Sequence, residues 1–189
     1  MRKFAFAVLS LCWLSSALAA EFTDTDGLVV EYDFRHESPT QADATPLVRV
    51  FGNGRLEVAI PWYRKAAGYY VGQLTQPELN QLLGEISQSG VTKFTGSMLA
   101  AEKREAKSKA TRLIYASERE RSSFSFALKD ARTVTQLTWL NLRLDADLYG
   151  AKSGKFETLW QIDRRLHGLS AHPSLRKVAE MQPPRRLAR

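Results

Sequence analysis

The chain has 189 residues and a formal net charge of +7, and Cys12 is its only cysteine. Since Cys12 lies in a segment with the pattern of a removable export signal, the mature chain is expected to form no disulfide framework, bind no metal through thiolates, attach no haem covalently and use no cysteine nucleophile. We also expect no cofactor. Leu11 precedes Cys12 at the place where a lipidated cysteine requires a small residue, so Cys12 is interpreted as an ordinary residue of an export signal.

The first 20 residues have the pattern of an export signal. Arg2 and Lys3 form its positive start, Phe4–Leu14 is an apolar run too short to span a bilayer, and Ala17-Leu18-Ala19 is a small-x-small cleavage site. We predict cleavage after Ala19 or Ala20 and a bacterial protein that is periplasmic or secreted. No later apolar run has the length of a membrane span, so no transmembrane segment is expected in the mature chain.

The charge is unevenly distributed along the chain. Residues 21–90 contain five basic against ten acidic residues, whereas residues 91–189 contain twenty basic against ten acidic ones. Such asymmetry indicates a basic face for an envelope protein or for an anionic glycan or lipid surface. An exported protein rarely meets nucleic acid, so we expect no nucleic-acid partner. The alternative is that the basic residues only solvate helices and a tail.

The first half of the chain alternates between strand and turn patterns. Gly27–His36 has the period-two alternation of a half-buried strand, and residues 37–45 have the composition of a loop. Asn53-Gly54 predicts a hairpin over residues 48–60 with a two-residue type I′ turn, which needs positive φ at both positions. Pro61 cannot donate to a sheet, so the second arm should end before it.

A strand and a helix are predicted next. Gly68–Leu74 is expected to return to the sheet, and Thr75 with Glu78 has the spacing of a capping box. A helix should then run to Gly90. Its apolar face comprises Leu79, Leu82, Leu83 and Ile86.

The second half is less regular. Val91–Phe94 is predicted to be extended and Gly96–Ala110 to be a surface helix. Residues 111–128 resemble a second hairpin, with Glu118-Arg119-Glu120 as its turn. Ala131–Tyr149 fits both a helix and a strand, and its length favours a helix. Lys155–His167 is a clearer helix, and the chain from Pro173 onward is predicted to be a loosely held basic tail.

These elements predict an α+β fold, in which helices cover one face of an antiparallel sheet of five or six strands. One domain is expected over residues 21–172. The turn Gly52-Asn53-Gly54-Arg55, the proline after the strand and the helix that begins Leu74-Thr75-Gln76-Pro77-Glu78 resemble bacterial exported domains of uncharacterised function, as does the hairpin ending in Phe126-Ala127-Leu128. The resemblance implies a fold and carries no catalytic or binding residue.

The titratable residues give little evidence of catalysis. Asp163 and His167 share a helix face, with His172 after the helix, but this spacing matches no established zinc motif and equally fits a polar i,i+4 pair. We assign no catalytic residue and no metal ligand. The strand carboxylates are expected to pair with arginines across the sheet. These expected pairs join Glu31, Asp33 and Glu57 to Arg35, Arg49 and Arg55.

The segment after the first hairpin is the best candidate for a binding surface. Its residues are Trp62, Tyr63, Arg64, Lys65, Tyr69 and Tyr70. Aromatic side chains beside cations can form a rigid contact surface, or the aromatics can simply cap the core. The favoured hypothesis is a non-catalytic exported domain that binds an envelope partner, most plausibly a protein. The alternatives are a cofactor-independent hydrolase of cell-wall glycan and a periplasmic domain that binds a small ligand.

Overall fold

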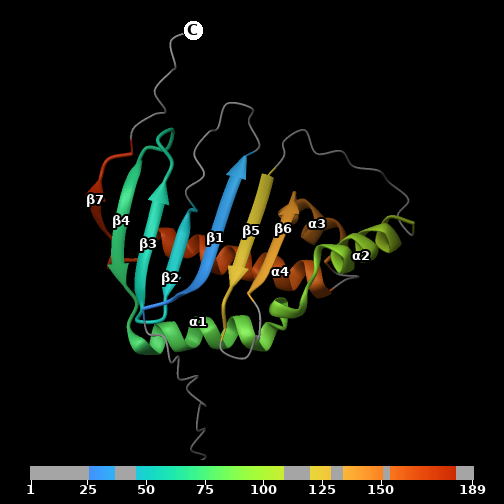
Figure 1. Cartoon of the computed structure of the whole chain (residues 1–189). Coiled ribbons are helices and arrows are strands. Elements are labelled where there is room, and N and C mark those ends of the chain that lie inside the picture. Colours follow the sequence, from blue (N-terminus) through green and yellow to red (C-terminus); the bar gives the residue numbers. More distant parts are fainter. Residues whose placement is uncertain (1–25, 37–45, 109–119, 129–133, 151–153, 182–189) are drawn as a thin grey trace, which may run out of the picture.

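The computed structural model describes residues 26–36, 46–108, 120–128, 134–150 and 154–181. In this part of the chain, seven strands form one antiparallel sheet in the order β6-β5-β1-β2-β3-β4-β7, accompanied by four α-helices (Figure 1). The strands are β1 (Leu28–His36), β2 (Val48–Phe51), β3 (Arg55–Ile60), β4 (Gly68–Gln73), β5 (Glu120–Phe126), β6 (Thr135–Leu140) and β7 (Arg176–Ala179). The helices are α1 (Gln76–Ser89), α2 (Gly96–Ser108), α3 (Leu142–Tyr149) and α4 (Gly154–Gly168), with 3-10 turns η1 (Val91–Lys93) and η2 (Leu169–Ala171). The α+β class with an antiparallel sheet is thus confirmed, with more strands than the five or six expected.

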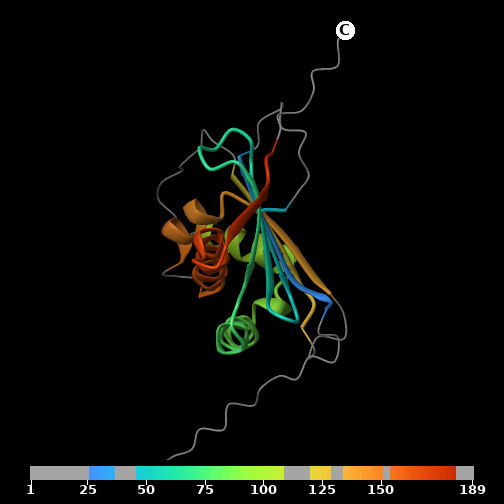
Figure 2. The same ribbon diagram turned by 90° about the vertical axis from the view of Figure 1, so that its left-hand side faces the viewer.

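One face of the sheet packs against the helices. Figure 2 shows α1, α3 and α4 on the same side of the sheet. Alternation along the strands directs one set of apolar side chains into the core on that side. This set comprises Val30, Tyr32, Val48, Val50, Leu56, Val58, Phe124, Phe126 and Leu137, and the helices contribute Leu79, Leu82, Leu83, Ile86, Phe156, Leu159, Ile162 and Leu166. The opposite face, called the open face below, carries no helix among the described residues.

The predicted hairpin over residues 48–60 forms, but its turn is not of type I′. Val48 pairs with Val58 and Val50 with Leu56. The N–H of Gly54 donates to the carbonyl of Phe51 at 2.9 Å, and Gly54 has φ 83°. Asn53 is not among the described residues with positive φ, so the turn is a three-residue loop closed by a left-handed glycine. A Cβ at Gly54 would lie 2.6 Å from the carbonyl oxygen of Leu74, which explains why a glycine stands there.

Helix α1 begins and ends where the sequence predicts. The carboxylate of Glu78 accepts hydrogen bonds from the backbone N–H and the hydroxyl of Thr75, both at 2.7 Å. These hydrogen bonds lower the pKa of Glu78. Gly90 follows the last turn with φ 71°. The four predicted apolar residues of α1 are all buried, so this helix is confirmed from cap to cap.

Removing the cap of α1 is expected to lower the stability of the protein by a modest, measurable amount. Thr75→Ala is expected to lower the free energy of unfolding by about 1 kcal/mol, because the start of the helix loses its side-chain partner. Urea denaturation of the variant and of the native protein measures the difference. Gln76→Ala, one residue further on, is the control and should change stability much less. Equal losses in both variants would contradict the capping role.

Several predictions for the second half are corrected by the structure. The segment over residues 91–93 is a 3-10 turn rather than extended, with Val91 buried. The described part of the segment predicted over residues 131–149, residues 134–149, is not one helix, because strand β6 is followed by helix α3. Asn141 stands between them with φ 55°, a left-handed conformation that breaks the strand before the helix starts. The strand pattern therefore applies to the first part of the described segment, and the helix pattern applies to the second part.

The predicted tail from Pro173 onward is wrong for Arg176–Ala179, which form β7 at the edge of the sheet beside β4. The second predicted hairpin is also changed. Its latter arm is β5, which begins at Glu120 and lies between β1 and β6. The export signal, the loop over residues 37–45, the first arm of that hairpin and residues 182–189 lie outside the described residues.

Candidate functional site

The predicted binding residues lie on the hairpin formed by β3 and β4. Its connecting loop, Pro61–Ala67, consists of two successive turns: the N–H of Arg64 donates to the carbonyl of Pro61 at 2.9 Å, and the N–H of Ala67 to the carbonyl of Arg64 at 3.0 Å. The hydroxyl of Tyr70 donates to the carbonyl of Ala66 at 2.8 Å and ties the loop to β4. The loop is therefore held by its own hydrogen bonds.

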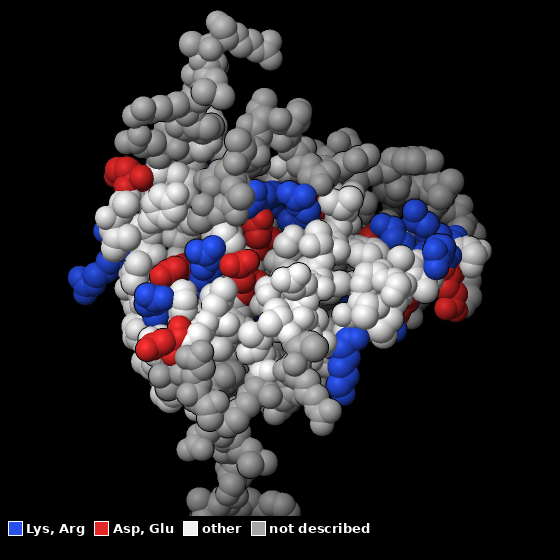
Figure 3. Space-filling model, in the orientation of Figure 1, with Lys and Arg blue, Asp and Glu red and all other residues white. Residues whose placement is uncertain are grey.

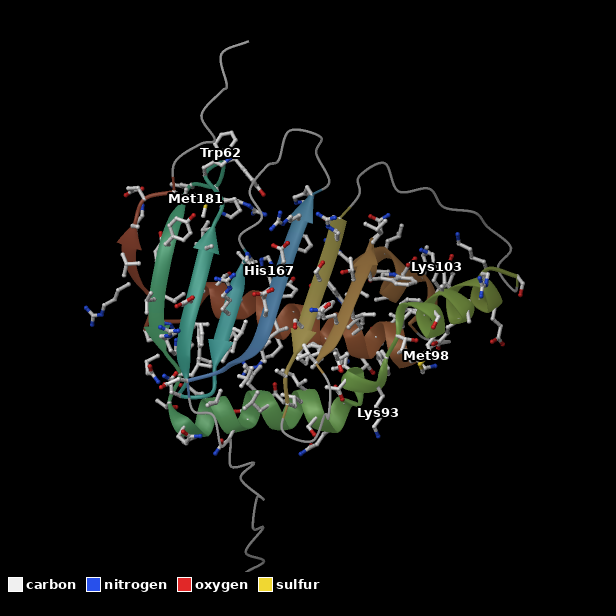
Figure 4. All side chains as sticks on the ribbon, in the orientation of Figure 1. Trp62, Lys93, Met98, Lys103, His167 and Met181 are labelled. Carbon is white, nitrogen blue, oxygen red and sulfur yellow. The ribbon has the colours of Figure 1, made fainter. Side chains whose placement is uncertain are left out.

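Four of the predicted residues form an exposed group at the end of this hairpin. Trp62 and Tyr63 are 43% and 42% exposed, and their rings meet edge to face at 5.8 Å. Arg64 and Lys65 follow them and are also exposed. Figure 4 places Trp62 at the end of the sheet, beyond β3 and β4. We call Trp62, Tyr63, Arg64 and Lys65 the aromatic tip.

The other two predicted residues lie on opposite faces of the sheet, because they are consecutive in β4. Tyr69 pairs with Ala59 on the open face and is 36% exposed. Tyr70 is half-buried and packs against the core on the helix side. Core packing, the alternative interpretation of these aromatics, thus applies to Tyr70 alone among them.

A shallow hollow lies on the open face beside Tyr69. Its volume is about 120 Å³, and it is lined mainly by Pro46, Arg49, Glu57, Ala59, Tyr69 and Val71. Ala59 is 6% exposed and is the smallest of these side chains. The hollow exists because a small residue stands between larger neighbours. The sequence does not predict this hollow, since nothing in an alternating strand marks an alanine as its floor.

The charges of the open face are largely paired. Glu31 bonds to Arg49 at 3.1 Å, and Arg55 lies 3.6 Å from Glu57. Asp33 bonds to Arg35, and burial raises the pKa of its carboxyl despite this pairing. Figure 3 shows acidic and basic side chains side by side on this face. Each of the three carboxylates is thus paired with an arginine, as predicted. Only Glu31 with Arg49 is a pair across the sheet, because the other two pairs each form within one strand.

A buried polar cluster lies beneath the sheet. Asp163 of α4 is 2% exposed, and its Oδ1 accepts a hydrogen bond from the Tyr32 hydroxyl at 3.0 Å. Burial raises the pKa of Asp163 to about 6, although hydrogen bonds from Ser122 and Tyr32 oppose the shift. Burial likewise raises the pKa of Tyr32. The sequence indicated that Tyr32 points inward, and a buried phenol needs an acceptor, but nothing identified Asp163 as that acceptor.

The suggested polar pair of Asp163 with His167 is not a direct contact. His167 lies behind the sheet, edge-on to Phe34 at 5.5 Å and to Tyr32 at 6.4 Å between ring centroids (Figure 4). Partial burial and the positive charge of Arg64 lower the pKa of His167. His167 therefore contacts the ring of Tyr32 in the buried cluster, and its pKa responds to the charge of Arg64 in the aromatic tip.

The possible metal ligands are not brought together. The Nε2 of His172 lies 3.5 Å from Glu78, and its Nδ1 is 2.8 Å from the hydroxyl of Ser174. Within the described residues, no group of three or more His, Cys, Asp or Glu side chains is arranged to hold a metal ion. Among the helices described, none has the length and apolar character that crossing a membrane requires.

No protein-family model, no curated protein and no solved structure matches this chain. Function is therefore inferred from the geometry and chemistry of the described surface alone.

Proposed function

We propose that the protein is an exported, non-catalytic domain that binds a partner protein of the cell envelope through the aromatic tip and Tyr69. The observation that carries this proposal is the exposure of Trp62 and Tyr63, at 43% and 42%, beside two exposed cations. Neither Arg64 nor Lys65 forms an ion pair with any described residue. Trp, Tyr and Arg are the residues most enriched at the energetic centres of protein interfaces.

The dimensions and pairing of the open face favour binding of a protein over the two alternatives. Small-molecule sites typically have volumes of about 300–1,000 Å³, whereas the hollow measures about 120 Å³. Glycan hydrolysis needs two carboxylates positioned on either side of a sugar. On the open face, Glu31, Asp33 and Glu57 are instead each paired with an arginine.

Truncation of the tip is the direct test. Trp62→Ala and Tyr63→Ala are each expected to weaken partner binding roughly 30-fold, the effect of losing about 2 kcal/mol at an interface centre. The melting temperature should stay close to that of the native protein, since both rings are exposed. Crosslinking pull-down from the cell envelope, followed by affinity measurement with the captured protein, gives the comparison.

The matched control truncates two apolar side chains whose exposure is similar to that of Trp62 and Tyr63 but which lie at β6, the strand at the opposite edge of the sheet. These are Val134 and Leu140, which are 55% and 40% exposed. The Val134→Ala/Leu140→Ala variant should capture the same partner as the native protein. If a folded Trp62→Ala/Tyr63→Ala variant captures it equally well, or if that variant unfolds, the tip is not a binding surface.

A further inference from the structure

The hollow and the aromatic tip belong to one continuous surface. Ala59, the floor of the hollow, pairs with Tyr69, and the next pair along the hairpin, Ile60 with Gly68, borders the loop that carries the tip. Tyr69 and Val71 form one wall of the hollow and are each 36% exposed. A partner that covers the tip and continues along the open face of β3 and β4 therefore passes over the hollow.

The hollow has the dimensions of a socket for one side chain. Its volume of about 120 Å³ equals that of roughly four water molecules at about 30 Å³ each. Its floor and walls are mainly apolar, formed by Ala59, Pro46, Tyr69 and Val71. Arg49 and Glu57 complete the lining, and each forms an ion pair with a residue outside the hollow. Poorly held water in such a space is readily displaced by an apolar group. One branched aliphatic side chain fits this space and this lining.

Three exposed cations on the β3–β4 hairpin and on β7 form no ion pair with the part of the chain that the structure describes. Arg176 of β7 pairs with Val71, so its side chain stands on the open face beside the wall of the hollow. Arg64 and Lys65 stand at the other end of the hairpin, and all three are exposed. None of the three forms an ion pair with a residue that the structure describes, whereas Lys177 is paired with Glu180 at 2.7 Å. Among the described residues, the unpaired charges at the two ends of this hairpin are therefore positive.

We propose that this surface binds an extended, acidic segment of the partner protein, which inserts one aliphatic side chain into the hollow over Ala59. The inference rests on the proposed function, because it specifies the chemistry of the partner that the same hairpin binds. The acidic residues of the segment lie against Arg176 on one side and Lys65 on the other. The aliphatic side chain between them packs against Tyr69.

The probe is the peptide acetyl-Glu-Asp-Leu-Glu-Asp-amide, titrated into ¹⁵N-labelled protein and followed by amide chemical shifts. It should shift the resonances of Ala59, Tyr69 and Val71. A peptide with Ala in place of Leu should bind about tenfold more weakly, because it buries less apolar surface. A peptide with Lys in place of all four acidic residues should not bind. Equal binding of the three peptides, or shifts confined to other parts of the protein, would overturn the proposal.

A larger side chain at Ala59, the floor of the hollow, tests the socket directly. Ala59→Ile adds three carbons, which take up roughly the volume of three water molecules, ~90 Å³, so the hollow is filled without removal of any contact. The variant should fold as the native protein does and lose peptide binding. Thr138→Ile makes a similar change at an exposed position of the same face, on β6, and should bind normally. Native-like binding by Ala59→Ile, or loss of binding by Thr138→Ile, would exclude the socket.

The same titration separates the failure of this inference from the failure of the proposed function. If peptide binding is lost in Ala59→Ile but kept in Trp62→Ala/Tyr63→Ala, the socket is supported and the aromatic tip is excluded from the binding surface. Envelope capture that depends on the tip but is unchanged in Ala59→Ile supports the tip and overturns the socket.

Discussion

Asp163→Asn is expected to stabilise the protein at neutral pH by about 3 kcal/mol. The native carboxyl has its pKa raised from 3.8 to about 6, and about two pKa units correspond to roughly 3 kcal/mol between the charged and neutral forms. Because folding favours the protonated acid, the contribution of Asp163 to stability is fully present below about pH 4 and is lost as the pH rises through about 6. Asparagine stays neutral throughout and can still accept the hydrogen bond from Tyr32.

Urea denaturation between pH 3.5 and pH 8 tests this expectation. The difference in unfolding free energy between Asp163→Asn and the native protein should grow from pH 4 to pH 7 and level off above that. Asp147→Asn, at an exposed position of α3, serves as the control and should show no such growth. A constant difference across the whole range would mean that Asp163 does not titrate in this window.

Asp145→Ala is expected to have the opposite effect and to destabilise the protein by about 3 kcal/mol. Asp145 is as buried as Asp163, at 2% exposure. Its Oδ2 accepts hydrogen bonds from Lys103 Nζ at 2.5 Å and from the indole Nε1 of Trp139 at 2.8 Å. Removing one partner of a buried charge pair typically costs about 3–5 kcal/mol. The expected loss is at the low end because Lys103 is 27% exposed and can turn to water.

Asp145→Asn distinguishes the charge of Asp145 from its hydrogen bonds. The amide oxygen can still accept the bond from Trp139, so this variant should lose less stability than Asp145→Ala. If both Asp145 variants are as stable as the native protein, Asp145 does not join α2, α3 and β6 as described.

The sequence predicted best those elements whose ends are marked by local chemistry. Thr75, Glu78 and Gly90 define α1 through hydrogen bonds and backbone conformation within a few residues. Pro61 ends β3 for an equally local reason. The ladder of Glu31, Arg49 and Glu57 followed from alternation alone, since cross-strand neighbours share a face.

The failures concern contacts between residues that are far apart in the chain. Arg176–Ala179 have no apolar pattern of their own and become a strand only because β4 offers an edge to pair with. The bond from Tyr32 to Asp163 spans 131 residues, and no local signal announces it. The six predicted binding residues were divided for a simpler reason: whether Tyr69 or Tyr70 faces outward depends on which face of β4 the helices cover.

The position of β7 also bears on how the domain assembles. Val71 pairs with Arg176, and the N–H of Gln73 donates to the hydroxyl of Ser174 at 2.9 Å, 101 residues later in the chain. A chain that emerges amino terminus first therefore holds this edge of β4 unpaired until residues 176–179 have been delivered. Contacts of such long sequence separation form slowly. The hairpin that carries the aromatic tip and the socket is thus the last part of the sheet to gain its second neighbour, so completion of folding and completion of the proposed binding surface coincide.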